Sequence, residues 1–312
     1  MSDAIGSSTF ACVVTLFAED GSVDEGAMAN HIGRIGGAGV GVYLGSSSPG
    51  EGYQLTMAEV DRLYALGAEV LKGVVPICAM GVEPRSAEHL LQYVRLAEKN
   101  ELDAMQLYCV DLGHGNKPSE ADLERYFRDL LENMSIPAAI SSHIAGGYAI
   151  PPAMVDALVS DYPHLIGINV TNPDLKYLLR VIEAADGRAA VHVGGPVQAL
   201  SVLALGGQGF LSSDANLAPQ LCQLLIDAYN ENDMATMLQS FDQIIRLFSS
   251  NRAAHGSARW MKAALKVLGL PGYHFRPPLL PLTDAEIAQV TADLATLDIP
   301  EIDDLKQIAP HR

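Results

Sequence analysis

Residues 165–195, LIGINVTNPDLKYLLRVIEAADGRAAVHVGG, contain two short apolar runs on either side of a segment with helical periodicity. The first run, IGINVT, ends at an Asn-Pro-Asp junction, and the second, AAVHVGG, ends in two glycines. An apolar run of strand length, a breaker, an amphipathic segment and a second apolar run predict a strand, a helix and a parallel strand in succession. The same stretch puts Asn169 where such a strand would present a reactive side chain.

This alternation extends over most of the chain. Eight candidate strands are identified by their apolar runs: ACVVTLF, GVYLG, VVPICAM, AMQLYCV, IPAAISSH, IGINVT, AAVHVGG and GFLSSD. Segments with helical periodicity lie between them, usually with Gly, Pro, Ser or Asn at the junction. We therefore predict an α/β fold, a (β/α)8 TIM barrel. A doubly wound sheet is the alternative, but no GxGxxG follows the first strand and no P-loop occurs.

The C-terminal part of the chain has a different pattern. Beyond residue 215 the sequence is helical throughout, apart from the Pro-rich RPPLLPL, and it shows no obvious chemistry. We predict a barrel over residues 1–225 and a C-terminal helical domain, an appendage to the barrel, over residues 226–312.

Composition restricts the class of protein and its partners. With 312 residues, 49% of them hydrophobic, the chain can bury a large core and is not a disordered protein. A formal net charge of −17 repels nucleic acid and anionic membranes, so neither is expected as a partner. No apolar run reaches the roughly 18 residues of a membrane span, and no basic segment precedes the first apolar stretch. We expect a cytoplasmic protein.

In a TIM barrel the reactive groups lie at the carboxyl ends of the strands and in the loops that follow. After the second predicted strand, Ser46, Ser47 and Ser48 offer hydroxyl and backbone N–H donors that suit a carboxylate or a phosphate. The alternative is an ordinary Ser/Gly/Pro loop followed by a helix that Thr56 caps.

Four other strand ends supply candidates. Ser141, Ser142 and His143 end the fifth strand beside the glycines at 146 and 147, and His143 could act as an acid or base or be a structural hydrogen-bonding group. Asn169 ends the sixth strand. Gly194 ends the seventh, where it suits either close approach to a ligand or a tight turn, and Leu211 lies in the eighth. Asp214 is a candidate for catalysis or for capping the next helix.

Metal and cofactor sites are not predicted. His114, His143 and His192 come from different strand ends and lack a clustered carboxylate. The four cysteines are far apart and form no CxxC motif, and no GxSxG occurs.

Several stretches resemble the family of dihydrodipicolinate synthase and N-acetylneuraminate lyase, class I aldolases. They are TLFAEDGSVDEGAM, GVGVYLGSSSPGEGYQLTMAE, NKPS, GFLSSDANLAP and KAALKVLGL with RPPLLPL, and they keep the family's order along the chain. The resemblance implies a barrel that assembles as a homotetramer or dimer and cleaves, forms or dehydrates bonds next to the carbonyl of a 2-oxo acid. It also implies a Schiff-base lysine, a proton-relaying tyrosine and a pair of hydroxyls that hold the carboxylate.

The chain departs from this pattern at its centre. The resemblance places Asn169 at the lysine position and Ser141 at the tyrosine position, while the family's arginine is lost among the glycines at 146 and 147. Ser46 and Ser47 keep the hydroxyl pair, and Ser48 belongs to an insertion that lengthens this loop.

The loss of the lysine changes the chemistry that can be expected. An amide nitrogen is not basic, so Asn169 cannot condense with a ketone. Lys117 and Lys176 are the nearest other amines, and the remaining lysines, Lys262 among them, are expected far from the strand ends.

Two functions stay open. The first is a lyase on a small 2-oxo acid in which Asn169 hydrogen-bonds the carbonyl oxygen, His143 or Asp214 moves the proton, and no lysine imine forms. The second is a barrel that has lost catalysis and binds a small carboxylic acid as a sensor or regulatory subunit. Neither needs a cofactor.

Overall fold

Eight parallel strands and the helices between them form a closed barrel with the strand order β1 to β8. This is a computed structural model, which describes residues 6–144, 147–250 and 257–308. The prediction of a TIM barrel with further helices at the C-terminus is confirmed. The strands are β1 Ser8–Cys12, β2 Gly41–Leu44, β3 Ile77–Ala79, β4 Ala104–Leu107, β5 Ala138–His143, β6 Leu165–Thr171, β7 Ala190–Gly194 and β8 Gly209–Ser212.

The first strand is where the sequence prediction fits least well. The apolar run ACVVTLF begins at residue 11, whereas β1 covers Ser8–Cys12. The ladder continues only as far as Val13, whose N–H bonds the Tyr43 carbonyl at 3.0 Å. The next N–H groups bond side chains instead: that of Val14 bonds Asn216 Oδ1, and that of Leu16 bonds Met28 Sδ. Apolar character therefore continues past the point where strand pairing ends.

Polar side chains fix where several helices begin. Thr56 and Glu59 form a reciprocal capping box at the start of α2, and Ser119 and Asp122 form another at α4. The helices of the barrel are α1 Glu25–Gly37, α2 Met57–Leu71, α3 Ala87–Lys99, α4 Glu120–Leu131, α5 Pro152–Asp161, α6 Leu175–Ala185 and α7 Ala199–Ala204, with short 3-10 turns η1 Gly52–Gln54, η2 Pro196–Gln198 and η3 Asp214–Asn216.

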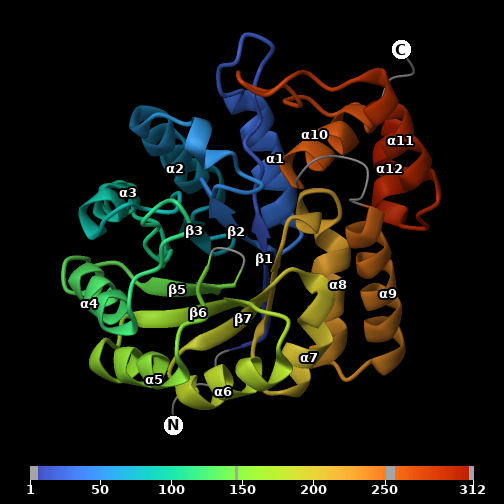
Figure 1. Cartoon of the computed structure of the whole chain (residues 1–312). Helices are drawn as coiled ribbons and strands as arrows, with labels where there is room; N and C mark the ends of the chain where they lie inside the picture. Colours follow the sequence, from blue (N-terminus) through green and yellow to red (C-terminus); the bar gives the residue numbers. More distant parts are fainter. Residues whose placement is uncertain (1–5, 145–146, 251–256, 309–312) are drawn as a thin grey trace. The chain divides into compact units, whose positions relative to one another are not determined.

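The chain forms two compact units. The first consists of the residues up to Ser8 and of Ile77–Leu211, and the second consists of Thr9–Pro76 and Ser212–Arg312. Within the first unit, β5, β6 and β7 lie side by side, and β5 and β6 form the longest ladder (Figure 1). The predicted division of the chain after residue 225 stays a prediction.

The second unit contains the C-terminal helices. They are α8 Pro219–Asn230, α9 Met234–Ser250, α10 Ser257–Val267, α11 Asp284–Ala295 and α12 Pro300–Ile308. A left-handed residue, Asn232 with φ of 60°, separates α8 from α9, which pack against each other (Figure 1). On α10, Trp260 and Lys262 are both buried. No helix within the described residues is long and apolar enough to cross a membrane.

Candidate active site

The ladder of β5, β6 and β7 brings three polar residues together in the first unit. Ser141 pairs in register with Asn169, and Asn169 pairs with His192. Register partners in a parallel ladder present their side chains on the same face of the sheet. These three residues are only 4–6% exposed. Two predicted site residues, Ser141 and Asn169, therefore lie next to each other.

Ser142, the next residue of β5, shows which face this is. Its hydroxyl accepts the N–H of Ile150 at 3.0 Å and lies 2.5 Å from the hydroxyl of Tyr177 on α6. Since α6 packs outside the barrel and side chains alternate along a strand, Ser141 and Asn169 face the barrel interior. Ser142 thus holds a loop and a helix in place, which corrects the expectation that it furnishes the mouth of the barrel.

The side chain of Asn169 is held by a residue that the sequence analysis missed. Asn169 Nδ2 donates a hydrogen bond to Gln106 Oε1, and Gln106 on β4 is only 3% exposed. Branched aliphatic side chains dominate the interior of most TIM barrels, so two buried amides there are unusual. The signal in the sequence was one polar residue inside the apolar run AMQLYCV.

His192 lies beside Asn169 as well, whereas the sequence pointed to it only as an unsupported metal ligand. Its Nε2 lies 2.9 Å from the hydroxyl of Ser8. Burial lowers the pKa of His192 to about 4, so the ring is neutral at physiological pH. Within the described residues no group of three or more His, Cys, Asp or Glu side chains could hold a metal ion.

His143, the last residue of β5, is partly buried. Burial lowers its pKa below the ordinary histidine value, while the Glu83 carboxylate acts in the opposite direction. The imidazole is therefore unprotonated near neutral pH, the form that a general base needs. The His143 carbonyl accepts the N–H of Tyr148, which closes the turn after the strand, and Gly147 in that turn has φ of 101°. Gly146, predicted beside it, lies outside the described residues.

Gly194 has a packing reason for lacking a side chain. A Cβ atom at this position would lie 2.0 Å from the hydroxyl oxygen of Thr171, the last residue of β6. Thr171 lies two residues after Asn169 and shares its face of the strand, a signal that the sequence analysis did not use. Leu211 pairs in register with Gly194, and its carbonyl accepts the N–H of Gly195 at 2.7 Å.

In the second unit, Asp214 is buried and paired with Ser212. The Ser212 hydroxyl donates to Asp214 Oδ2 at 2.5 Å, and the Asp214 N–H donates back to that hydroxyl at 3.0 Å. Burial raises the pKa of Asp214 to about 6, although the Ser212 bond opposes this shift. The expectation that Asp214 caps the next helix is wrong, because neither η3 nor α8 has a side-chain cap.

The loop after β2 belongs to the second unit and is folded back on itself. The buried Ser46 accepts the N–H of Gly50 on its hydroxyl at 3.1 Å and that of Gly52 on its carbonyl at 2.8 Å. Ser47 is half-buried, and the exposed Ser48 pairs with the Ser257 hydroxyl at 2.7 Å. The predicted cap of the following helix by Thr56 is confirmed.

The sequence predicts two other amines nearest the strand ends, Lys117 and Lys176, and places Lys262 far from them. Lys117 and Lys176 are exposed, and Lys117 Cε approaches the turn at Gly147. The structure corrects the expectation for Lys262, which is fully buried and forms an ion pair with Glu51 of the loop after β2. No local pattern indicates this contact, because Lys262 is one of two lysines in an amphipathic helix.

Comparison with known proteins identifies relatives over nearly the whole chain. A sequence profile of the Dihydrodipicolinate synthetase family matches residues 6–297. The 4-hydroxy-tetrahydrodipicolinate synthase of Chlorobaculum parvum is 26% identical over 301 residues, which are 96% of this chain and 100% of the relative. The putative 2-dehydro-3-deoxy-D-gluconate aldolase YagE of Escherichia coli K12 is 26% identical over 294 residues, which are 92% of this chain and 95% of the relative.

Solved structures share the fold. The crystal structure of E. coli YagE in complex with pyruvate matches with a TM-score of 0.86 and 25% sequence identity, covering 95% of this chain and 100% of that one. Dihydrodipicolinate synthase from Aquifex aeolicus matches with a TM-score of 0.85 at 20% identity, over 95% and 99% of the two chains. The second likeness shows the fold alone.

Proposed function

Because this chain belongs to the dihydrodipicolinate synthetase family, we propose that it is a lyase, of aldolase or hydro-lyase type, that acts on a small 2-oxo acid without forming a lysine imine. The observation that carries the proposal is the buried pair of Asn169 and Gln106 inside the barrel. An amide cannot condense with a ketone, but its N–H group can donate to a carbonyl oxygen and stabilise the charge of an enolate. A preorganised donor of this kind contributes about 3 kcal/mol to the stability of a transition state.

We assign the other roles residue by residue. His143 is the proposed base, because its lowered pKa leaves the imidazole neutral near pH 7. Asp214, whose pKa is raised to about 6, is a second candidate for proton transfer. Ser141 supplies a hydroxyl beside Asn169. For the substrate carboxylate we propose the hydroxyls of the loop after β2, and the resemblance to the family favours Ser46 and Ser47 among them.

A test of this proposal follows proton exchange at pyruvate, the acid bound by the related YagE. Wild-type protein in D2O should replace the methyl protons of pyruvate by deuterium, because an enolate forms and is reprotonated by solvent. Treatment with borohydride and pyruvate should leave both the protein mass and the exchange rate unchanged, because no imine is available for reduction. His143→Ala should lose the exchange while retaining pyruvate binding. Exchange that borohydride abolishes, together with a gain in mass, would contradict the proposal and reveal another amine.

The second candidate is a sensor or regulatory barrel, which the resemblance to the family favours because it places Asn169 at the position of the imine-forming lysine. It predicts a thermal shift on adding a small carboxylic acid, with no deuterium exchange by the wild-type protein for any acid that binds.

The resemblance to the family also leads us to propose a homotetramer or homodimer, which light scattering on the purified protein would measure.

A further inference from the structure

The serine loop, residues 45–52 after β2, has a conformation that leaves little room for variation. A Cβ atom on Gly50 would lie 2.7 Å from the Ser46 carbonyl oxygen, and one on Gly52 would lie 2.3 Å from the Gly45 carbonyl oxygen. The hydroxyl of Thr15 donates to the Gly50 carbonyl at 2.5 Å. The loop is therefore a compact turn in which Ser46 is the central acceptor.

Glu51 connects this turn to the C-terminal helices. Its backbone has φ of 51°, the left-handed region that a residue other than glycine seldom adopts. Its side chain is fully buried and pairs with the ammonium group of Lys262 on α10, which is also 0% exposed. Among the described residues, no other group pairs with this carboxylate. The left-handed backbone and the buried ion pair therefore occur at the same residue of the loop.

The surroundings of Lys262 fix its ammonium group. It donates to the His274 carbonyl at 2.8 Å and lies 4.3 Å from the ring centroid of Phe17 and 4.8 Å from that of Phe275. Burial lowers the pKa of Lys262 to about 8 and raises that of Glu51, and each group opposes the shift of the other. If Glu51 moved and the Lys262 ammonium group moved with it, the ammonium would lose its contacts with the His274 carbonyl and the two phenylalanine rings.

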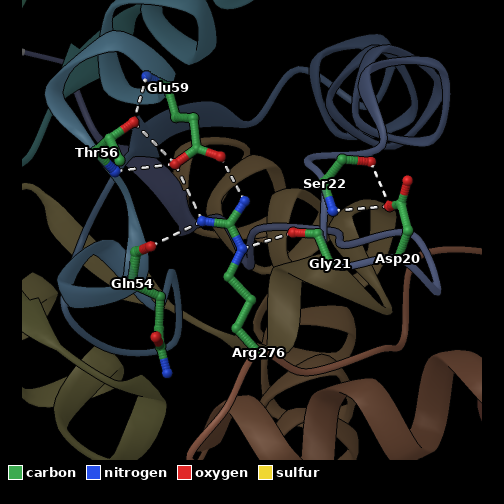
Figure 2. Close-up of polar contacts among 7 residues, drawn as sticks. All are labelled: Asp20, Gly21, Ser22, Gln54, Thr56, Glu59 and Arg276. Carbon is green, nitrogen blue, oxygen red and sulfur yellow. Dashed lines mark hydrogen bonds and ion pairs between the residues drawn. The ribbon is translucent and has the colours of Figure 1, made fainter.

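A second cation from the same part of the chain anchors the segment just after the loop. Figure 2 shows the guanidinium of Arg276 between Glu59, at the start of α2, and the carbonyls of Gly21 and Gln54. It donates to Gly21 at 2.6 Å, to Gln54 at 2.7 Å and to both carboxylate oxygens of Glu59. Its guanidinium carbon lies 4.4 Å from the Phe17 ring centroid. The segment that follows the serine loop is thus tied to residues of the C-terminal region as well.

We propose that Lys262 and Glu51 are positioning residues, whose buried ion pair holds the serine loop in the conformation that presents the Ser46 and Ser47 hydroxyls to a substrate carboxylate. This inference rests on the proposed function for its ligand, and on geometry alone for its conformational part. It gives the C-terminal helices a role in ligand binding although neither residue of the pair touches the ligand.

Hydrogen exchange measures the conformational part without any ligand. The amides of Gly50 and Gly52 both bond Ser46, so their protection reports the turn. In the double variant Lys262→Met/Glu51→Gln, which leaves no unpaired buried charge, we expect these amides to exchange about tenfold faster or more, with peptides of α8 and β5 unchanged. Lys266→Met, the same change at an exposed lysine of α10, is the matched control and should keep wild-type rates. Wild-type protection of both glycines in the double variant would overturn the proposal.

Pyruvate binding by titration calorimetry measures the functional part. We expect the double variant to bind pyruvate about tenfold more weakly and Lys266→Met to bind like the wild type. A loosened turn with unchanged pyruvate affinity would overturn the positioning role while leaving the proposed function intact. A wild-type protein that binds no pyruvate would count against the proposed function, and hydrogen exchange alone would then decide whether the pair fixes the loop.

Discussion

The side-chain nitrogen of Asn169 donates a hydrogen bond to the side-chain oxygen of Gln106, and both amides are buried on strands of the barrel. The bond fixes the plane of the Asn169 amide and determines which of its ends points toward Gln106. A residue that stands where an imine-forming lysine is expected is therefore oriented by a neighbour. The barrel interior is polar at this level, because Ser141 and His192 lie on either side of Asn169 in register.

Removing one amide of the pair should cost more than removing both. In Gln106→Leu, the Asn169 side chain loses the Gln106 oxygen that accepts its N–H group, and we expect a loss of about 1–3 kcal/mol in the free energy of unfolding. The double variant Gln106→Leu/Asn169→Leu should recover part of that loss, because apolar groups can replace both partners. Urea denaturation of the four proteins in the cycle measures the coupling, and strictly additive losses would show that the bond contributes nothing.

Asn169→Lys should restore an amine that forms an imine. A lysine buried at this position has a lowered pKa, so a fraction of it is the neutral nucleophile at neutral pH. Incubation with pyruvate and borohydride should then add the mass of one reduced pyruvate, which peptide mapping should place at residue 169, while the wild-type protein gains nothing. A folded variant that traps no pyruvate would show that residue 169 does not face the ligand.

The free energy of unfolding should decrease as the pH is lowered, partly because of His192. Its pKa is about 4 in the folded protein and about 6.5 in an unfolded chain, so below pH 6.5 the unfolded state binds a proton that the folded state rejects. At about pH 5 this linkage costs roughly 2 kcal/mol relative to about pH 7.5. The variant His192→Gln can still bond Ser8. Between about pH 7.5 and about pH 5, its free energy of unfolding should decrease by roughly 2 kcal/mol less than that of the wild type. Urea midpoints at the two pH values test this, and equal losses would refute it.

Gly194→Ala should destabilise the protein through a clash with Thr171. The new Cβ would lie 2.0 Å from the Thr171 hydroxyl oxygen, and overpacking of this kind costs about 1–3 kcal/mol. Thr171→Ala removes that oxygen and leaves a Cβ contact of 3.1 Å, so the double variant should regain most of the loss. Thermal unfolding compares the three variants with the wild type. If Gly194→Ala instead keeps full stability and only weakens ligand binding, the glycine serves the ligand rather than the packing.

The barrel could be predicted from sequence because its signals are local. Apolar runs bounded by breakers, such as IGINVT before Asn-Pro-Asp, mark strands independently of the rest of the chain. The candidate site was predicted only in part, because the partners of its residues are distant in sequence. Asn169 and Ser141 followed from the position of the strand ends, but the pairing with Gln106 depends on which residues of β4 and β6 face each other. The ion pair of Glu51 and Lys262 depends on tertiary packing that no local pattern encodes.

The buried indole of Trp260 provides a natural optical probe. Trp260 is the one tryptophan of the sequence and is 1% exposed on α10, two positions before Lys262. Excitation at wavelengths that spare tyrosine therefore yields emission from a single site, at the short wavelengths typical of an indole in apolar surroundings. A red shift of that emission reports the entry of water at α10, so the integrity of this helix can be followed in real time without a label.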